Sequence, residues 1–300
     1  MFTHAKGMEP VASSEGVTVY CPENGKFSFF NSPYPMHAAY SAVDIFCGSG
    51  FGCLTPSPVY GEVVEIRRVK CPDKKDFECS SFDYVILLRS LENPNVLVKL
   101  LHVEPVVEVG DTVKPGDDLG SFIRSGFFDF WTEPHIHVEV RNPSDSLRAR
   151  GGFTFESLVT PKNNAAELEK LVGRVVELRD EYSLVALNEN LEYGVPVDVD
   201  GCVGFLDAGI PHYKTFGVHM CTCPSAGGTV NLCGAKIGVV KSVYAGMCVA
   251  HCANINFTLN GKPVRLAFYV HLSKPLLKVI PYRIGELRLE KFEEVSIVIS

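Results

Sequence analysis

The residue types and spacing best suited to chemistry lie near the middle of the chain, in Pro134-His135-Ile136-His137-Val138-Glu139-Val140. Polar and apolar residues alternate strictly here, and a β-strand directs successive side chains to opposite faces. His135, His137 and Glu139 therefore share one face, with two imidazoles side by side. Neutral imidazole nitrogens bind Zn²⁺ at about 2.0–2.1 Å, so this strand could supply part of a metal site. A half-buried edge strand with a polar outer face is the alternative.

Two other segments carry residues that could complete such a site. Asp44 lies within the apolar stretch 42–45, where an ionised carboxylate is costly to bury unless it is paired or binds a metal. His102 ends the apolar segment 96–102, and a turn rich in Gly-Asp and Pro-Gly pairs follows at 109–120. Asp44 therefore needs a partner, and His102 could add a third imidazole to a site formed by His135 and His137.

The elements expected to position these residues are short β-strands. Segments 59–66, 83–88 and 96–102 are rich in β-branched and apolar residues, and Pro- or Asn-rich turns lie between them. No helical period occurs before residue 150. The strand pattern returns in the second half, at 173–178, 182–187, 236–243, 255–259, 264–272 and 294–299. The sequence thus predicts an all-β fold in both halves.

The length of 300 residues suits two domains rather than one core. We place a first β domain at 1–160 and a second β-rich domain, with no assigned role, at 173–300. Between them, 161–172 has a helical pattern, with an asparagine at 163 or 164 as its cap and Leu168 on its apolar side. We expect a helical linker there.

These motifs, in this order, resemble the lysostaphin-type, or LytM-like, zinc metallopeptidases, which have a duplicated-hybrid-motif β-sandwich or barrel fold. That family shows a His-x-x-x-Asp segment, a Gly-x-Val strand, a Tyr-x-His-Leu strand end with a Gly-Asp-x-Val-x-x-Gly turn, and finally His-x-His-x-Glu. The similarity covers residues 30–145, somewhat under half of the chain. The matching segments here are Ser41-Ala42-Val43-Asp44-Ile45, Gly61-Glu62-Val63, Leu101-His102-Val103 with 110–120, and His135-Ile136-His137-Val138-Glu139-Val140.

Carried over position by position, the resemblance implies that His137 and Asp44 are zinc ligands. It also implies that His135 and His102 flank a metal-bound water and stabilise the transition state. Zinc lowers the pKa of its water to about 7 and polarises a carbonyl, and a nearby imidazole can exchange a proton near neutral pH. The implied function is zinc-dependent hydrolysis of a peptide or amide bond, as in a metalloendopeptidase, on a peptide-like substrate.

The first motif departs from the family pattern. Tyr40 stands four residues before Asp44, where the third ligand belongs, and the nearest histidine, His37, stands seven before. Either His37 reaches the metal through a local insertion, or Tyr40 replaces it as a weak oxygen ligand, or the site has lost zinc. We favour His37. The alternative function is a zinc-degenerate, non-catalytic member of the same fold that binds or regulates a protein partner.

A second departure precedes the histidine pair. The segment Ser125-Gly126-Phe127-Phe128-Asp129-Phe130-Trp131-Thr132 carries three Phe and the only Trp of the chain. If it is exposed, it forms an apolar patch able to close over a groove. If it is buried, it is a plug, which would argue against a polymeric peptide substrate.

Composition excludes several other classes of protein. Hydrophobic content of 46% and charged content of 21% describe an ordinary globular chain, and the net charge of −7 with scattered basic residues gives no support to nucleic-acid binding. We find no signal peptide in 1–25 and no apolar window of about 18 residues, which predicts a cytoplasmic protein without a membrane segment. Most of the eleven cysteines should then be reduced thiols. The sequence does not specify an oligomeric state.

Four further patterns carry less weight. Segments 61–66 and 97–105 echo 238–243 and 266–275, as if the second domain were a divergent copy of the first, but shared strand composition is the favoured explanation. The turn at 110–120 also resembles biotinyl and lipoyl carriers, which require a lysine in a setting that this chain lacks. Asp207 and His212 lie in a Gly/Pro-rich loop, for which a turn is preferred over the lining of a cleft. The second domain also contains a Cys/His group that could hold a structural zinc ion, but its spacing favours reduced thiols in the core. The group consists of His219, Cys221, Cys223, Cys233, Cys248, His251 and Cys252.

Overall fold

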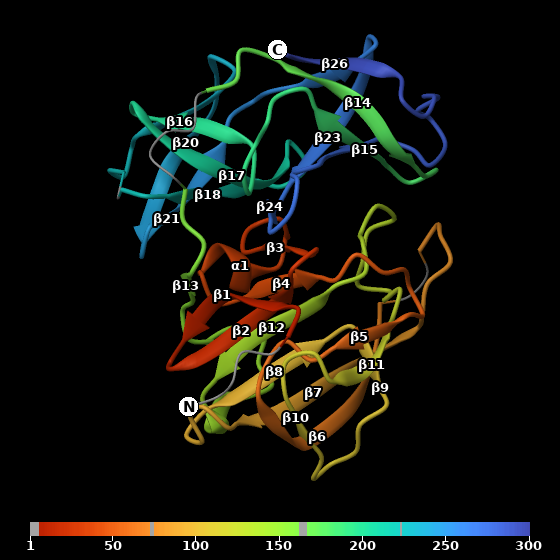
Figure 1. Ribbon diagram of the computed structural model, residues 1–300, viewed down its shortest axis with the longest axis vertical. Helices are drawn as coiled ribbons and strands as arrows, with labels where there is room; N and C mark the ends of the chain where they lie inside the picture. The colour runs from red at the N-terminus through yellow and green to blue at the C-terminus, as the bar shows by residue number, and fades with distance from the viewer. Residues whose placement is uncertain (1–5, 73–74, 162–166, 223) are drawn as a thin grey trace. The chain divides into compact units, whose positions relative to one another are not determined.

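The computed structural model describes residues 6–72, 75–161, 167–222 and 224–300 (Figure 1). With 49% of residues in strands and 2% in helices, the protein is all-β, which confirms the predicted fold class. The chain divides into two compact units. Unit 1 contains the described residues of Met1–Phe27 and Ala39–Leu158, and unit 2 contains those of Ser28–Ala38 and Val159–Ser300. An eleven-residue loop of the N-terminal half therefore belongs to the C-terminal unit.

The main sheet of unit 1 is antiparallel and carries the candidate site. Its β12 strand lies between β8 and β4, and all six residues of β12 are buried, including those on its polar face. The histidine-bearing face and the apolar face of this strand are therefore both shielded from solvent. In order, the strands are β10 (Thr112–Val113), β6 (Gly61–Lys70), β7 (Phe82–Ser90), β8 (Leu97–Leu101), β12 (Ile136–Arg141), β4 (Val43–Phe46) and β3 (Lys26–Ser28).

Two smaller sheets complete unit 1. A three-stranded sheet has the order β5 (Leu54–Pro56), β11 (Asp118–Phe122) and β9 (Val103–Pro105), and a second has β13 (Glu156–Ser157), β1 (Met8–Ser14) and β2 (Val17–Pro22). The chain passes from β8 of the main sheet to β9 of the small sheet through His102, whose φ of 73° lies in the left-handed region. A one-turn 3-10 helix, η1 (Pro143–Asp145), follows β12.

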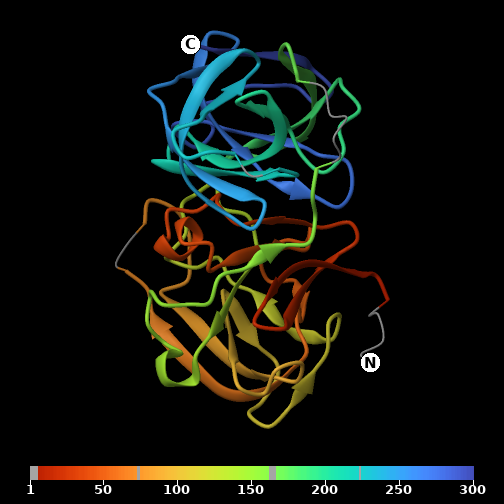
Figure 2. The same cartoon turned by 90° about the vertical axis from the view of Figure 1, so that its left-hand side faces the viewer.

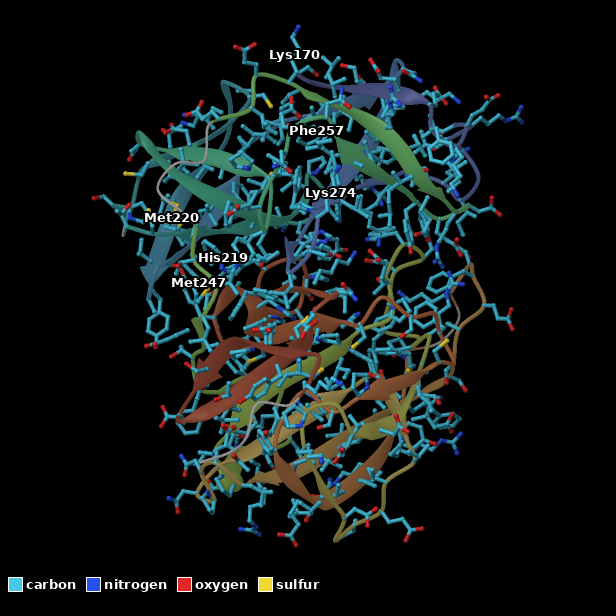
Figure 3. All side chains as sticks on the ribbon, in the orientation of Figure 1. Lys170, His219, Met220, Met247, Phe257 and Lys274 are labelled. Carbon is cyan, nitrogen blue, oxygen red and sulfur yellow. The ribbon has the colours of Figure 1, made fainter. Side chains whose placement is uncertain are left out.

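Unit 2 is built from one continuous antiparallel sheet (Figure 2). Two additional pairings, β16 with β17 and β23 with β25, close this sheet into two rings of strands. Its core contains buried apolar side chains from both rings, among them Met220, Met247 and Phe257 (Figure 3). In order, the strands are β16 (Pro196–Val199), β19 (Thr229–Leu232), β20 (Ala235–Tyr244), β21 (Met247–Cys252), β18 (Thr215–Met220), β17 (Cys202–Ile210), β23 (Lys262–Phe268), β22 (Phe257–Leu259), β26 (Glu294–Ile299), β14 (Leu171–Leu178), β15 (Ser183–Leu187) and β25 (Leu277–Ile280).

The expected helical linker at 161–172 is wrong over its described part. Residues 162–166 lie outside the described residues, and 167–170 contain no helix. Leu171 already begins β14, where the buried positions Leu171, Gly173 and Val175 recur with the period of two that a strand requires. This strand period, together with pairing to β15 and β26, prevails over a weak helical pattern.

Three further observations bear on the predictions from the sequence. Asp207 lies within β17, not in a turn, and is fully buried. The structure's only α-helix among the described residues, α1 (Pro35–Ala38), is a single turn. No helix in the described ranges is long and apolar enough to cross a membrane.

Candidate metal centre

Two neighbouring strands bring Asp44 and His137 together. Strands β4 and β12 pair antiparallel with these two residues directly opposite one another. The Asp44 Oδ1 accepts a hydrogen bond of 2.8 Å from Nδ1 of His137, and both side chains are buried. The partner that a buried carboxylate requires is therefore the second histidine of the central motif.

The other nitrogen of His137 is held by Glu139. Nε2 donates to Glu139 Oε1 at 3.1 Å, and this carboxylate also accepts from Lys99 Nζ at 3.1 Å and Arg141 Nη1 at 3.0 Å. Carboxylates that hold the second nitrogen of a ligating histidine fix its ring orientation and raise its basicity. Sequence analysis placed Glu139 on the histidine face but gave it no role, although its spacing of two from His137 along a strand was the available signal.

Burial and charge act in opposite directions on this pair. Burial alone would lower the pKa of His137, but the hydrogen bonds and negative charges of Asp44 and Glu139 outweigh it and raise this pKa to about 9. For Glu139, burial would raise the pKa, and the hydrogen bonds and charges of His137 and Lys99 lower it to about 2. The network is thus a compact arrangement of compensated charges.

His37 lies on α1 and is also buried. Its Nδ1 is 2.7 Å from the carbonyl oxygen of Phe29, which can only accept, so Nδ1 carries the proton. In the neutral ring, Nε2 then carries the lone pair, which is the form of imidazole that binds metals. A main-chain carbonyl thereby selects the tautomer of His37.

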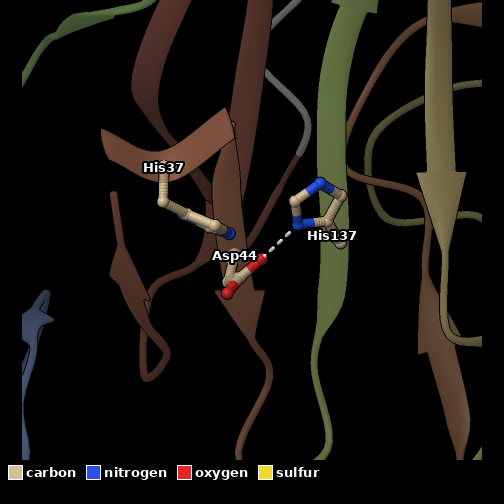
Figure 4. A group of neighbouring side chains, drawn as sticks. All are labelled: His37, Asp44 and His137. Atoms are coloured by element: carbon tan, nitrogen blue, oxygen red, sulfur yellow. Dashed lines mark hydrogen bonds and ion pairs between the residues drawn. The ribbon is translucent and has the colours of Figure 1, made fainter. Parts of the chain in front are cut away.

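One ligand atom from each of His37, Asp44 and His137 lies within 4.8 Å of the others (Figure 4). Ligand atoms around a tetrahedral Zn²⁺ lie about 3.3 Å apart, a separation between the 2.8 Å of the Asp44–His137 hydrogen bond and the 4.8 Å that bounds the group. Tyr40, at the family's ligand position, is buried in a left-handed conformation with φ of 60°, and its carbonyl oxygen accepts from the Phe155 amide at 2.7 Å. His37, not a residue at the expected spacing, completes the His-Asp-His group.

His102 is held by a carboxylate that sequence analysis missed. Asp83 on β7 accepts from His102 Nδ1 at 2.6 Å, from the His102 amide at 3.0 Å and from Ser125 Oγ at 2.5 Å. Burial would raise the pKa of Asp83, but the charge and hydrogen bonds of His102 and the Ser125 hydroxyl lower it to about 2. Like Asp44, Asp83 is a carboxylate in an apolar strand, so the cost of burying its charge was the available sequence signal.

His135 stands beside His102, with ring centroids 5.0 Å apart. Its Nδ1 donates to the Glu133 carbonyl at 2.9 Å, and its Nε2 lies 3.7 Å from Asp44 Oδ2. Burial lowers the pKa of His135 to about 4, despite the nearby charge of Asp44. The His102 ring is also near His137, at 6.1 Å between centroids. The imidazole rings of His102, His135 and His137 therefore form one cluster.

The aromatic segment before the histidine pair, residues 125–132, was expected to be either an exposed apolar patch or a buried plug, and it contains both. The Phe128 ring packs on His102 and His135 at centroid distances of 4.5 and 4.9 Å and is 6% exposed. Its neighbour Phe127 is 51% exposed. Phe128 is therefore a plug over the two histidines, whereas Phe127 faces solvent.

The Cys/His group of the second domain forms no comparable site in the described part of the chain. No group of three ligand atoms arises there, and Cys223 lies outside the described residues. The described cysteines are free thiols, most of them at least partly buried. Burial raises the pKa of Cys248 to about 12 and that of Cys252 to about 11, which keeps both thiols protonated and unreactive.

Comparison with known proteins gives two matches. A family model described as "Domain of unknown function (DUF8155) N-terminal domain" matches residues 18–157. A solved structure titled "NMR solution structure of lysostaphin" is similar with 16% sequence identity and a TM-score of 0.27, over 85% of this chain and 87% of that chain. No curated protein sequence matches. The family match spans all the residues of the His-Asp-His group, together with His102, His135 and the carboxylates that hold them.

Proposed function

We propose that the protein is a zinc-dependent hydrolase of peptide or amide bonds, with His37, Asp44 and His137 as the metal ligands. The observation that carries the proposal is the buried group of two imidazoles and a carboxylate whose ligand atoms lie within 4.8 Å of one another. Borderline-soft Zn²⁺ favours this mixture of nitrogen and oxygen donors, and three protein ligands leave a position open for catalysis.

The hydrogen bonds around the ligands support this assignment. The Phe29 carbonyl fixes His37 with its lone pair on Nε2, and Glu139 holds Nε2 of His137 so that Nδ1 faces Asp44. A structural charge network around His137 would not require a second histidine whose tautomer is selected in this way. The donors present therefore fit a zinc ion.

A zinc ion held there supplies a Lewis acid for the substrate carbonyl and activates water at neutral pH. Two further histidines have the geometry to move protons beside it. Asp83 holds the Nδ1 proton of His102, and the Glu133 carbonyl holds that of His135, so each ring keeps a basic Nε2. The two rings offer Nε2 acceptors for the proton of the attacking water, and the ring that takes this proton would return the same proton to the leaving amine.

One observation favours a second candidate, a non-catalytic protein of the same fold that binds a partner. Phe128 covers His102 and His135, and each of the five proposed site residues is at most 9% exposed. A polymeric substrate requires that this ring move aside. The exposed Phe127 next to it would then be a contact for a protein partner.

Zinc stoichiometry tests the proposal directly. Purified full-length protein, loaded with zinc and desalted, should contain about one Zn²⁺ per chain by mass spectrometry of metals. His137→Ala and His37→Ala should each lose it, and Tyr40→Phe should keep it, which identifies the third ligand. A wild-type protein that retains no zinc would overturn the proposal.

Hydrolysis distinguishes the two candidates once zinc is bound. The zinc-loaded protein would be incubated with a mixed peptide library, and new amino termini would be detected by mass spectrometry. We expect cleavage that His102→Ala and His135→Ala reduce by at least about 100-fold, in line with loss of general acid–base catalysis. If Phe128→Ala, which uncovers the histidines, also shows no cleavage, the non-catalytic function is favoured.

A further inference from the structure

The loop that carries His37 belongs to the other unit of the protein. The chain leaves unit 1 after Phe27 and rejoins it at Ala39, and the residues between, Ser28–Ala38, are part of unit 2. Asp44 and His137 both belong to unit 1. The loop that carries His37 is therefore held by other residues of unit 2.

The loop is fixed at its start by Asp207 on β17. The Asp207 carboxylate is fully buried and accepts from Ser28 Oγ at 2.6 Å and from the Phe29 amide at 2.6 Å. It also accepts from the Phe30 amide at 3.3 Å and from His219 Nε2 at 3.2 Å. Hydrogen bonds from several donors to one buried carboxylate form a rigid and energetically demanding network.

Aromatic packing around the same carboxylate adds to this anchor. The His219 ring lies 5.3 Å from the Phe29 ring and 5.9 Å from the Phe30 ring, between centroids. Gly217, on the same strand as His219, is covered so closely that an added Cβ would overlap the ring of Phe30. The loop start is thus held by polar contacts on one side and by close packing on the other.

Phe29 connects this anchor to His37. Its amide donates to Asp207 at 2.6 Å, and its carbonyl oxygen accepts from His37 Nδ1 at 2.7 Å. The Phe29 carbonyl shares one planar peptide unit with the Phe30 amide, which also donates to Asp207, at 3.3 Å, so the direction of that carbonyl is fixed as well. The carboxylate of Asp207 therefore reaches the imidazole of His37 through a single intervening residue.

We propose that Asp207 is a positioning residue for the third metal ligand: through Phe29 it fixes the tautomer and direction of the His37 ring. Zinc binding through His37 then depends on the carboxylate of Asp207. This inference rests on the proposed role of His37 as a ligand.

The test is the zinc affinity of full-length Asp207→Asn, measured by competition with a chromophoric chelator. Asparagine keeps the shape of the side chain but cannot accept from the Phe29 amide and Ser28 with both atoms. We expect affinity to fall by about 10–100-fold, as is typical when a residue that orients a ligand is lost. The matched control is Asp198→Asn, because Asp198 is also a hydrogen-bonded carboxylate of unit 2 but bonds to Gly201 and Asn231.

A double-mutant cycle separates positioning from a general loss of structure. If Asp207 acts through His37, adding Asp207→Asn to His37→Ala should lower zinc affinity by less than about twofold. An equal drop in both backgrounds would overturn the inference. If Asp207→Asn fails to fold, Ser28→Ala removes only one of the hydrogen bonds to Asp207 and should weaken zinc binding about fivefold.

A second readout does not depend on zinc. In metal-free protein, NMR of the ring nitrogens should show the Nδ1–H tautomer of His37, and Asp207→Asn should convert it to a mixture of tautomers. If the wild-type protein binds no zinc, the proposed role of His37 as a ligand is wrong. The NMR signal of His37 then still tests whether Asp207 positions its ring. Folded Asp207→Asn with wild-type zinc affinity and an unchanged His37 signal would overturn the inference while the proposed function stands.

Discussion

The two units each contain a buried Asp–His pair across neighbouring antiparallel strands. In unit 1, Asp44 on β4 accepts from His137 on β12 at 2.8 Å, and in unit 2, Asp207 on β17 accepts from His219 on β18 at 3.2 Å. The residue types, the burial and the sheet setting are alike. The two pairs differ in what surrounds the carboxylate.

Imidazoles surround Asp44, whereas main-chain amides and a hydroxyl surround Asp207. Asp44 has His135 at 3.7 Å in addition to His137, and His37 supplies a further ligand atom within 4.8 Å. The oxygens of Asp207 accept from Ser28 and from two backbone amides. A metal can replace protons on imidazoles but not those on amides, so the neighbours decide which pair can hold an ion and which anchors a loop.

The largest effect should come from removing the carboxylate charge in the first pair. Asp44→Asn should lower zinc affinity by more than about 100-fold, because a direct ligand contributes more than the residues that orient it. Chelator competition measures the change, with Asp198→Asn as the control. If Asp44→Asn weakened zinc binding less than Asp207→Asn does, the distinction between the two pairs would be lost.

A smaller effect is expected from disturbing the packing of the second pair. Gly217→Ala forces a methyl group into the Phe30 ring and should lower the free energy of unfolding by about 3 kcal/mol. Urea denaturation followed by circular dichroism measures this change. Gly50→Ala is the control, because its added Cβ would meet only Cys53 Sγ, at 4.0 Å. Equal stability of the two variants would contradict the close packing described for the anchor.

The protein contains a third Asp–His pair, Asp83 with His102, whose contribution to stability should depend on pH. Because the pKa of Asp83 falls from 3.8 to about 2 on folding, its charge stabilises the folded protein above about pH 4, and that contribution disappears as pH falls through about 2. The contribution is about 2 kcal/mol. Urea unfolding of wild type and Asp83→Asn should therefore differ by this amount at pH 6, and the difference should shrink towards pH 2. A difference independent of pH would exclude the charged pair.

The sequence predicted the parts of this molecule that depend on short-range patterns. Strict alternation placed His135 and His137 on one face, and the cost of burying a charge indicated that Asp44 needs a partner, which is His137. The same argument was not applied to Asp83, and the position of Glu139 was seen without its role. These two were within reach of sequence analysis because strand spacing and burial of charge are local properties.

The loop Ser28–Ala38 was beyond sequence analysis because its structure depends on residues far along the chain. Asp207 is 178 positions from Phe29, and nothing in a strand pattern indicates that such a carboxylate accepts from a loop near the N-terminus. Asp207 was instead assigned to a turn from its Gly and Pro neighbours. The helix expected at 161–172 failed for a related reason, since pairing with β15 and β26 decides the conformation of Leu171 onward.

The assignment of Ser28–Ala38 to the second unit has a consequence for how this protein can be divided. A cut near residue 158 looks like a natural boundary, and the family match ends at 157. A fragment that ends there would keep the aromatic loop but lose Asp207 and Gly217, leaving Phe29 and Phe30 exposed to water. A genetic exchange at that point would therefore not transfer a domain that folds by itself. The two halves of the chain would have to be inherited together.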